Sequence, residues 1–178
     1  MGAFRLQLGR YLSLTALRRE LEGWAQEAIG ENKDAQPLQT IPGIGSVLAL
    51  IILAEAGDLR RFGHHRQFLK FRGLDLAKSQ SGVSRGRETS SKRGNRRLRC
   101  AFWMAGAVAV RMRQNSFRDK YERYIKPDPL DPDLRRKALA AVMAKMARVA
   151  CGIVKAQTPY RTYREAAVPV DRSRSAGP

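Results

Sequence analysis

The chain has 178 residues and carries 34 lysines and arginines against 16 acidic residues, so its formal net charge is +18. This excess predicts a polyanionic partner, because neutralising phosphates releases counterions, and DNA is the partner we expect. Apolar residues make up 43% of the sequence, enough to bury a core, which argues against a wholly disordered basic tail. No apolar run reaches membrane-span length and no cleavable leader is recognisable, so the sequence predicts a cytoplasmic protein without a membrane partner.

Helical periodicity begins in the first third of the chain. Apolar residues three or four positions apart predict an amphipathic helix that Thr15 caps and that ends near Gly30. These residues are Leu17, Leu21, Trp24 and Ala28. Because no partner for this helix is evident, we interpret residues 1–37 as a helical arm, of coiled-coil type, with its linker.

The same period continues to about residue 156, and no segment alternates with the period of a strand. The expected helices are a short one before the Pro-Gly-Ile-Gly turn, then Ser46 to Ala56, His64 to Arg72, Asn95 to Arg113, the segment DKYERYI, and Leu134 to Ala156. The fold class is therefore all-α: a helical bundle containing a helix-hairpin-helix. Residues 38–160 form its main domain, and residues 161–178 form a basic, flexible tail that we expect to be disordered.

The stretch TIPGIGSVLA places a Gly-x-Gly turn directly before the helix that begins at Ser46. In a helix-hairpin-helix, the glycines at 43 and 45 let N–H groups at the start of the second helix approach a phosphate, and the helix dipole adds to the attraction. The alternative is a tight turn that only joins two packed helices. We favour phosphate binding by Gly43, Gly45 and Ser46 because of the charge of the chain.

Positive charge is densest around the start of the helix predicted from Asn95, which is the expected N-cap. The cations that crowd this end are Lys92, Arg93, Arg96, Arg97 and Arg99. Helix N-termini prefer acidic residues, so such a cluster is unfavourable unless an anion is supplied from outside. We therefore predict that these cations and Asn95 bind DNA, with a solvated basic loop as the alternative.

Patterns typical of metal sites are absent from the sequence. Cys100 and Cys151 are isolated and are interpreted as small core residues. His64 and His65 are adjacent and point in different directions, which makes a poor ligand pair. The acids of the Pro-rich connector KPDPLDPD are interpreted as turn formers and helix caps. No metal site and no cofactor are assigned to this chain.

Ser81 is the loop hydroxyl that we single out, because Gly82 beside it leaves room for a phosphodiester and arginines nearby can neutralise a pentacoordinate oxyanion. Residue types alone do not separate it from other hydroxyls that would simply donate a hydrogen bond to a phosphate. Those are Ser79, Ser84, Ser90 and Ser91.

Three linked motifs resemble the C-terminal domain of the insertion-sequence 110/116/902 group of transposases, which is related to Piv-type DNA invertases. They are LQTIPGIGSVLALIILAEAGDLRRFGHHRQFLKFRGL, then QSG, then SKRGNRRLR, in a consistent order between about Leu38 and Tyr160. The resemblance implies a mostly helical domain in which the serine of the Q-S-G motif, here Ser81, is the nucleophile on DNA. Residues 91–99 correspond to the basic block of the family.

The sequence departs from that family in two places. Leu76 stands where the family usually has a proline. Full-length members begin with a RuvC-like domain whose D-E-D-D carboxylates bind divalent metal, and nothing before Leu38 resembles it. A divalent metal is therefore expected only in that missing domain.

Two classes of function follow from these observations. The first is a transposition or recombination module that binds DNA and supplies Ser81, inactive by itself without a RuvC-like domain. The second is a DNA-binding transposon remnant or regulator without chemistry. The resemblance also permits a guide RNA, a RuvC-like domain or full-length transposase, and further copies of the chain in a homo-oligomer as partners.

Overall fold

A computed structural model describes residues 2–73, 76–77, 80–81, 84–85, 89–90 and 93–162; of the short pieces between residues 73 and 93 it describes the backbone. The helices are α1 (Gly2–Glu31), α2 (Ala35–Gln39), α3 (Ser46–Ala56), η1 (Leu59–Arg61), α4 (His65–Phe71), α5 (Arg96–Ala109), α6 (Ser116–Ile125) and α7 (Pro132–Ala156). Helices dominate the described residues, which confirms the all-α prediction.

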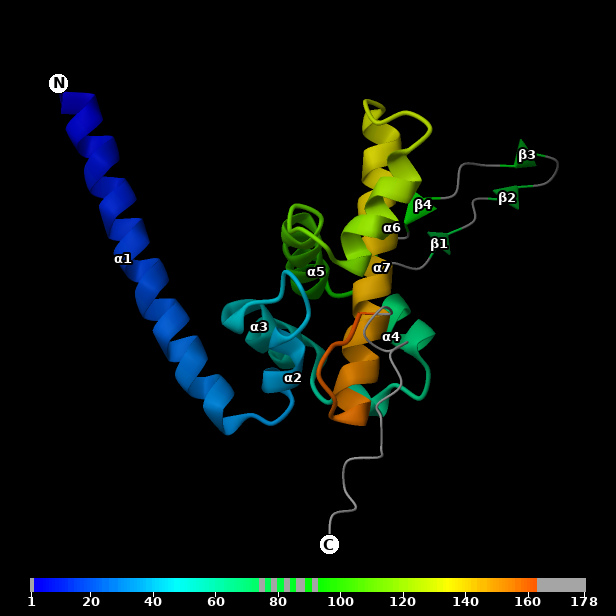
Figure 1. The fold of residues 1–178 in the computed structure, drawn as a ribbon, viewed down its shortest axis with the longest axis horizontal. Helices are drawn as coiled ribbons and strands as arrows, with labels where there is room; N and C mark the ends of the chain where they lie inside the picture. Colours follow the sequence, from blue (N-terminus) through cyan, green and yellow to red (C-terminus); the bar gives the residue numbers. More distant parts are fainter. Residues whose placement is uncertain are drawn as a thin grey trace, which may run out of the picture.

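The long helix α7 is central to the helical body, where α4, α5 and α6 pack against it and α3 packs against α5 (Figure 1). Apolar side chains from all these helices share one core. Phe68 of α4, Phe102 of α5 and Met146 of α7 are fully buried in it. The rings of Phe68 and Phe102 meet edge to face with their centroids 5.9 Å apart, so α4 and α5 are joined through aromatic packing.

Several helix ends lie where local sequence signals predicted them. The apolar helix α3 has the predicted bounds and ends at Gly57, whose φ of +63° suits a glycine. Asn95 caps α5, since its Oδ1 accepts a hydrogen bond of 2.9 Å from Leu98 N. In the connector, Asp131 caps α7 and Asp128 accepts from Leu130 N, which confirms that these acids form caps and turns.

The end of α5 differs from the prediction, because the helix stops at Ala109 and not at Arg113. Asn115 explains the difference. Its buried side-chain amide donates hydrogen bonds of 2.8 Å to Ala109 O and 3.1 Å to Met112 O, while its Oδ1 caps α6. One asparagine thus satisfies the carbonyls that end one helix and the amides that begin the next.

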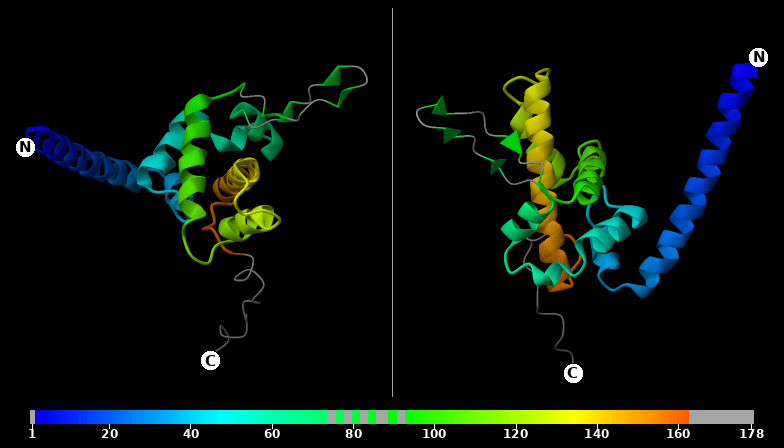
Figure 2. Two further views of the ribbon diagram at one scale, coloured as in Figure 1. Left: turned by 90° about the horizontal axis from the view of Figure 1, so that it is seen from above. Right: turned by 180° about the vertical axis from the view of Figure 1, so that it is seen from behind.

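The arm helix is longer than predicted and is not capped by Thr15. Helix α1 runs from Gly2 to Glu31, and Thr15 lies inside it with its hydroxyl donating a hydrogen bond of 2.8 Å to Tyr11 O. In three views the helix extends away from the body and meets it only near its C-terminal end (Figures 1 and 2). Its buried residues are accordingly Ala25 and Ile29.

Strand pairs that the sequence did not predict form a two-stranded arm between α4 and α5. β1 (Leu76–Ala77) pairs with β4 (Thr89–Ser90), and β2 (Gln80–Ser81) pairs with β3 (Ser84–Arg85), both antiparallel. The arm starts where Gly73 and Gly94 pass each other, since a Cβ on Gly94 would lie 2.5 Å from Gly73 N. Strands this short, whose register depends on pairing and not on an apolar face, leave no period-2 signal.

Two further sequence expectations concern the tail and membranes. Residues 163–178 of the predicted basic tail lie outside the described residues. Within the described ranges, no helix combines the length and the apolar composition that crossing a membrane requires.

Candidate nucleic-acid interface

The Gly-x-Gly turn between α2 and α3 packs against the C-terminal half of α5. Gly43 has a φ of +88°, and a Cβ there would lie 2.2 Å from Ala105 O and 3.0 Å from Ala109 N. The residue is therefore required for packing and for backbone conformation together. Packing against α5 therefore explains a glycine at position 43, and phosphate binding by Gly43 stays a prediction.

Gly45 is under less constraint than Gly43. Gly45 is exposed, its φ of −89° and ψ of −178° suit any residue, and a Cβ would meet none of the described atoms within 4 Å. No side chain of the described residues caps α3, so its first amides are left to solvent or a ligand. Gly43, Gly45 and Ser46 all line one hollow, and Gly45 is the most exposed of the three.

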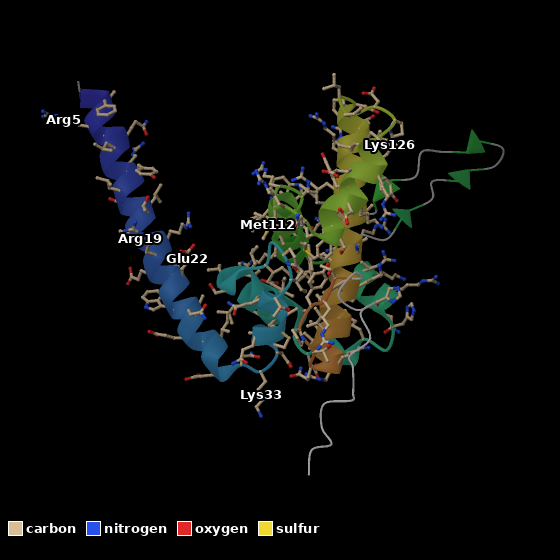
Figure 3. All side chains as sticks on the ribbon, viewed as in Figure 1. Arg5, Arg19, Glu22, Lys33, Met112 and Lys126 are labelled. Carbon is tan, nitrogen blue, oxygen red and sulfur yellow. The ribbon has the colours of Figure 1, made fainter. Side chains whose placement is uncertain are left out.

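An open hollow lies in front of these amides. One side of it is lined by the Gly-x-Gly turn with Val108 and Met112, and the opposite side is lined by Glu22 of helix α1 (Figure 3). Glu22 is paired with Arg18 at 2.8 Å, which offsets part of its negative charge. Arg111 and Arg113 flank Met112 and are exposed. These two arginines were not among the predicted binding residues, although the run RMR in the sequence could have indicated them.

The N-terminal end of α5 carries a counter-charge that the sequence prediction did not include. Glu55, at the end of α3, accepts hydrogen bonds of 2.7 Å from Asn95 Nδ2 and 3.2 Å from Arg97 Nη1. The bond from Asn95, followed by that from Arg97, lowers the pKa of Glu55 below its usual value. The prediction that an anion must come from outside is therefore wrong for this part of the cluster.

The predicted cations have different surroundings. Arg93 and Arg96 are exposed, and Arg97 is 83% exposed even while it pairs with Glu55. Arg99 is half-buried and Lys92 lies outside the described residues. The Gly-x-Gly turn packs against residues 105–109 of α5, whereas the cations surround the N-terminal end of that helix. At a rise of 1.5 Å per residue, these two parts of α5 are about 15 Å apart. The two predicted DNA-binding sets thus lie toward opposite ends of one helix.

Ser81 lies apart from both sets. It pairs with Ser84 across β2 and β3, toward the outer end of the two-stranded arm and well away from the helical body (Figures 1 and 2). The described arginines at the start of α5 lie beside the base of this arm. The fold therefore places the backbone of Ser81 toward the outer end of this arm, where the neighbouring pair joins Gln80 and Arg85.

Arg72, one residue before the arm, is fully buried, and its three side-chain nitrogens have no hydrogen-bond partner among the described residues. Its Cζ lies 4.6 Å from the ring centroid of Phe102. Burial, with a smaller contribution from Arg99, lowers the pKa of Arg72 to about 9. Sequence reasoning missed this burial, because a residue in a basic run is expected to be exposed.

The cysteines and the acids of the described residues do not gather into a metal-binding cluster. Cys151 is buried as expected, and burial raises the pKa of its thiol to about 11, whereas Cys100 is exposed on α5, contrary to the prediction. No group of three or more histidine, cysteine or acidic side chains that could hold a metal is present in the part of the chain that the structure describes.

Comparison with known proteins identifies the family. The family model described as Transposase IS116/IS110/IS902 matches residues 35–122, the region from α2 through the two-stranded arm to α6. This region belongs to the IS116/IS110/IS902 transposase family.

Individual relatives extend the match beyond this region of the transposase family. The transposase for insertion sequence element IS1111A of Coxiella burnetii is 32% identical over 130 residues, which are 73% of this chain and 35% of that protein. A probable family 20 transposase of Pseudomonas aeruginosa is 28% identical over 149 residues, 84% of this chain and 44% of that protein. The pilin gene-inverting protein of Moraxella bovis is 25% identical over 130 residues, 72% of this chain and 39% of that protein. The chain spans less than half the length of each of these relatives.

Proposed function

We propose that the chain is a DNA transposition or recombination module that binds the DNA backbone and supplies Ser81 as the nucleophile. The observation that supports this most directly is the position of the Q-S-G serine within the family match, on an arm that projects from a basic helical body. The transposases and the pilin gene-inverting protein among its relatives are consistent with that role.

In the proposed reaction the Ser81 hydroxyl attacks a backbone phosphorus. A serine–phosphate ester forms, one P–O bond of the DNA breaks, and the leaving oxygen of the DNA takes a proton. The oxyanion needs positive charge beside it, which the described arginines at the base of the arm do not supply at Ser81. A RuvC-like domain in cis or in trans is therefore proposed to complete the site, and no step here is assigned to metal held by this chain.

DNA would be held along α5. At one end, the free amides at Gly45 and Ser46 point into an open hollow. At the other, Arg93, Arg96 and Arg97 are exposed around the first turn, and Glu55 neutralises part of their charge. Contacts of this kind are made to phosphates, so binding should depend steeply on salt and little on sequence.

A DNA-binding regulator or transposon remnant without chemistry is the second candidate. The separation of Ser81 from the exposed cations at the start of α5 favours it, since such a protein needs the basic surfaces but no nucleophile. In that case the binding surfaces would be intact and Ser81 would be dispensable.

Trapping of a covalent protein–DNA species separates the two candidates. Wild type, Ser81→Ala, Ser79→Ala and Ser84→Ala are each assayed with and without a RuvC-like domain of the family. We expect adducts only with that domain present, from all variants except Ser81→Ala. DNA affinity of Ser81→Ala should stay within a few-fold, because one neutral hydroxyl contributes only about 1 kcal/mol. Equal adduct formation by Ser81→Ala would reject the nucleophile.

A further inference from the structure

Four cations gather on a face that neither predicted DNA-binding set includes. Lys120 and Arg123 lie on α6, and Lys145 and Arg148 lie on α7, which packs against α6. The charges of Lys120, Arg123 and Arg148 act together with burial to lower the pKa of Lys145, and those of Arg148 and Arg123 do the same to Lys120. Lys120 and Lys145 therefore each lie within Coulombic range of the other and of both arginines.

Packing holds part of this cluster in place. Lys145 Nζ donates a hydrogen bond of 2.7 Å to Ser116 O and lies 5.2 Å from the ring centroid of Phe117. Lys120 Nζ lies 5.8 Å from the ring centroid of Tyr124. Lys120, Arg123 and Tyr124 line an open hollow on α6. Two of the four cations thus border a concave surface, and all four are carried by helices and not by loops.

Neighbouring arginines on the same two helices are paired with acids, and these four cations are not. Arg118 pairs with Glu122 on α6, and Arg136 pairs with Asp133 on α7. Across the described ranges, no carboxylate lies within ion-pair distance of the cluster, and Asp119 is the one acid whose charge raises the pKa of Lys145. Like charges held together without carboxylate partners destabilise the free protein, so the arrangement fits an external anion.

We propose that the cationic surface of α6 and α7, here called the α6–α7 groove, binds the sugar–phosphate backbone of a nucleic-acid strand. It comprises the hollow that Lys120, Arg123 and Tyr124 line on α6, together with Lys145 and Arg148 on α7. The proposal rests on the proposed function but names a surface separate from both ends of α5. An extended strand fits better than a small anion, because the cations spread over two helices and do not converge on one point. Tyr124 is 45% exposed beside them and offers a ring on which a base can stack.

Positive charge also lies near the start of α4. The pKa of His65 is lowered by burial, then by His64, and then by the charge of Arg148. His65 therefore lies within Coulombic range of Arg148. Arg66 adds a further exposed cation there. A strand lying along α7 would therefore meet positive charge from α6 to α4.

The test compares two triple variants that remove the same charge. The groove variant carries Lys120→Gln, Arg123→Gln and Arg148→Gln. The control carries Lys33→Gln, Lys126→Gln and Lys137→Gln, three exposed lysines outside the groove, two of which Figure 3 labels. Affinity is measured by fluorescence anisotropy with a single-stranded DNA and an RNA oligonucleotide of the same sequence across a salt series.

We expect the groove variant to bind at least tenfold more weakly than the control and to lower the slope of log K against log salt by about 2, at about 0.7 per phosphate contact on a single strand. Loss confined to DNA or to RNA identifies the strand that the groove holds. Tyr124→Ala should weaken single-strand binding about tenfold or more with an unchanged slope, because it removes stacking and no charge.

Two outcomes overturn the proposal in different ways. If the groove variant binds like the control while Arg93→Gln, Arg96→Gln and Arg97→Gln together weaken binding, the groove is rejected and the proposed function stands. If wild type binds neither oligonucleotide, both are rejected. Thermal melting monitors folding, and the single variants Arg123→Gln and Arg148→Gln, at exposed positions, decide the matter if the triple variant does not fold.

Discussion

The side-chain amide of Asn95 lies 2.7 Å from Glu55 Oε2, and this hydrogen bond ties the end of α3 to the beginning of α5. Asn95 also caps Leu98 N, and its backbone N–H donates to Phe71 O at 2.9 Å. One residue thus joins α3, α4 and α5 at the base of the arm that carries Ser81. Asn95 is engaged in structure here, although the sequence suggested it for DNA binding.

Acid should destabilise the protein partly through Glu55. Its pKa is lowered in the folded state, so its contribution is present above the unfolded pKa of about 4.3 and is lost as pH falls through the folded value. We expect Glu55→Gln to lose stability at pH 7 and to show a smaller further loss between about pH 5 and 3 than wild type. Urea unfolding at both pH values measures this. The control Glu27→Gln, at an exposed position, should retain the wild-type pH dependence, and a parallel loss in Glu55→Gln would contradict the prediction.

The two glycines of the turn should respond differently to substitution. Gly43→Ala places a Cβ against Ala105 O at a positive φ, so it should destabilise the fold by about 2–4 kcal/mol. Gly45→Val meets open space in an extended conformation and should melt within a few degrees of wild type. Its DNA affinity should fall several-fold, because the side chain obstructs the first amides of α3. Unchanged affinity in folded Gly45→Val would show that the turn only joins helices.

Arg72 should weaken the free protein. Removing a lone cation from water costs several kcal/mol, more than the roughly 2 kcal/mol of a desolvated cation–π contact with Phe102. We therefore expect Arg72→Met to raise the free energy of unfolding at pH 7 by about 1–3 kcal/mol. Arg113→Met, at an exposed position, is the matched control and should change little.

The effect of Arg72 should also depend on pH. Its pKa of about 9 is below that of an unfolded arginine, so above pH 9 the folded protein releases this proton before the unfolded chain does. The free energy of unfolding of wild type should then rise relative to that of Arg72→Met. The difference in this free energy between the two proteins should become smaller between pH 8 and 10.5. A variant less stable than wild type at pH 7 would show that Arg72 has a partner that offsets its burial.

The long N-terminal helix α1 should mediate self-association. Leu14, Leu17, Leu21 and Trp24 follow the spacing of a coiled-coil seam and are each about half exposed, between 47% and 66%. The test variant combines Leu14→Gln, Leu17→Gln and Leu21→Gln. We expect light scattering after size-exclusion chromatography to report an oligomer for wild type and a monomer for this triple variant.

The control for helix α1 carries Leu8→Gln and Leu12→Gln, at two positions on the opposite face of the same helix. It should remain oligomeric. A monomeric wild type would mean that the exposed seam is covered by another protein, or by a domain that this chain does not include.

The sequence by itself determined the features that depend on neighbours a few residues away. The apolar period placed α3 from Ser46 to Ala56, Asn95 marked the start of α5, and the acids of the connector formed caps and turns. Helix periodicity and caps are local interactions, so a single sequence contains them in full. The ordered motifs around Q-S-G likewise indicated the transposase family, which comparison with known proteins then identified.

Only the tertiary structure decided the features that depend on residues far apart in the chain. The backbone of Ala105 leaves no room for a side chain at position 43, whereas position 45 has open space. Glu55 of α3 supplies the negative charge beside the cations at the start of α5. Arg72 becomes buried because Phe102 covers it, and the cations of α6 and α7 meet because those helices pack together. In each case the partner comes from a different helix, and helix packing, which local periodicity does not specify, brings the two residues together.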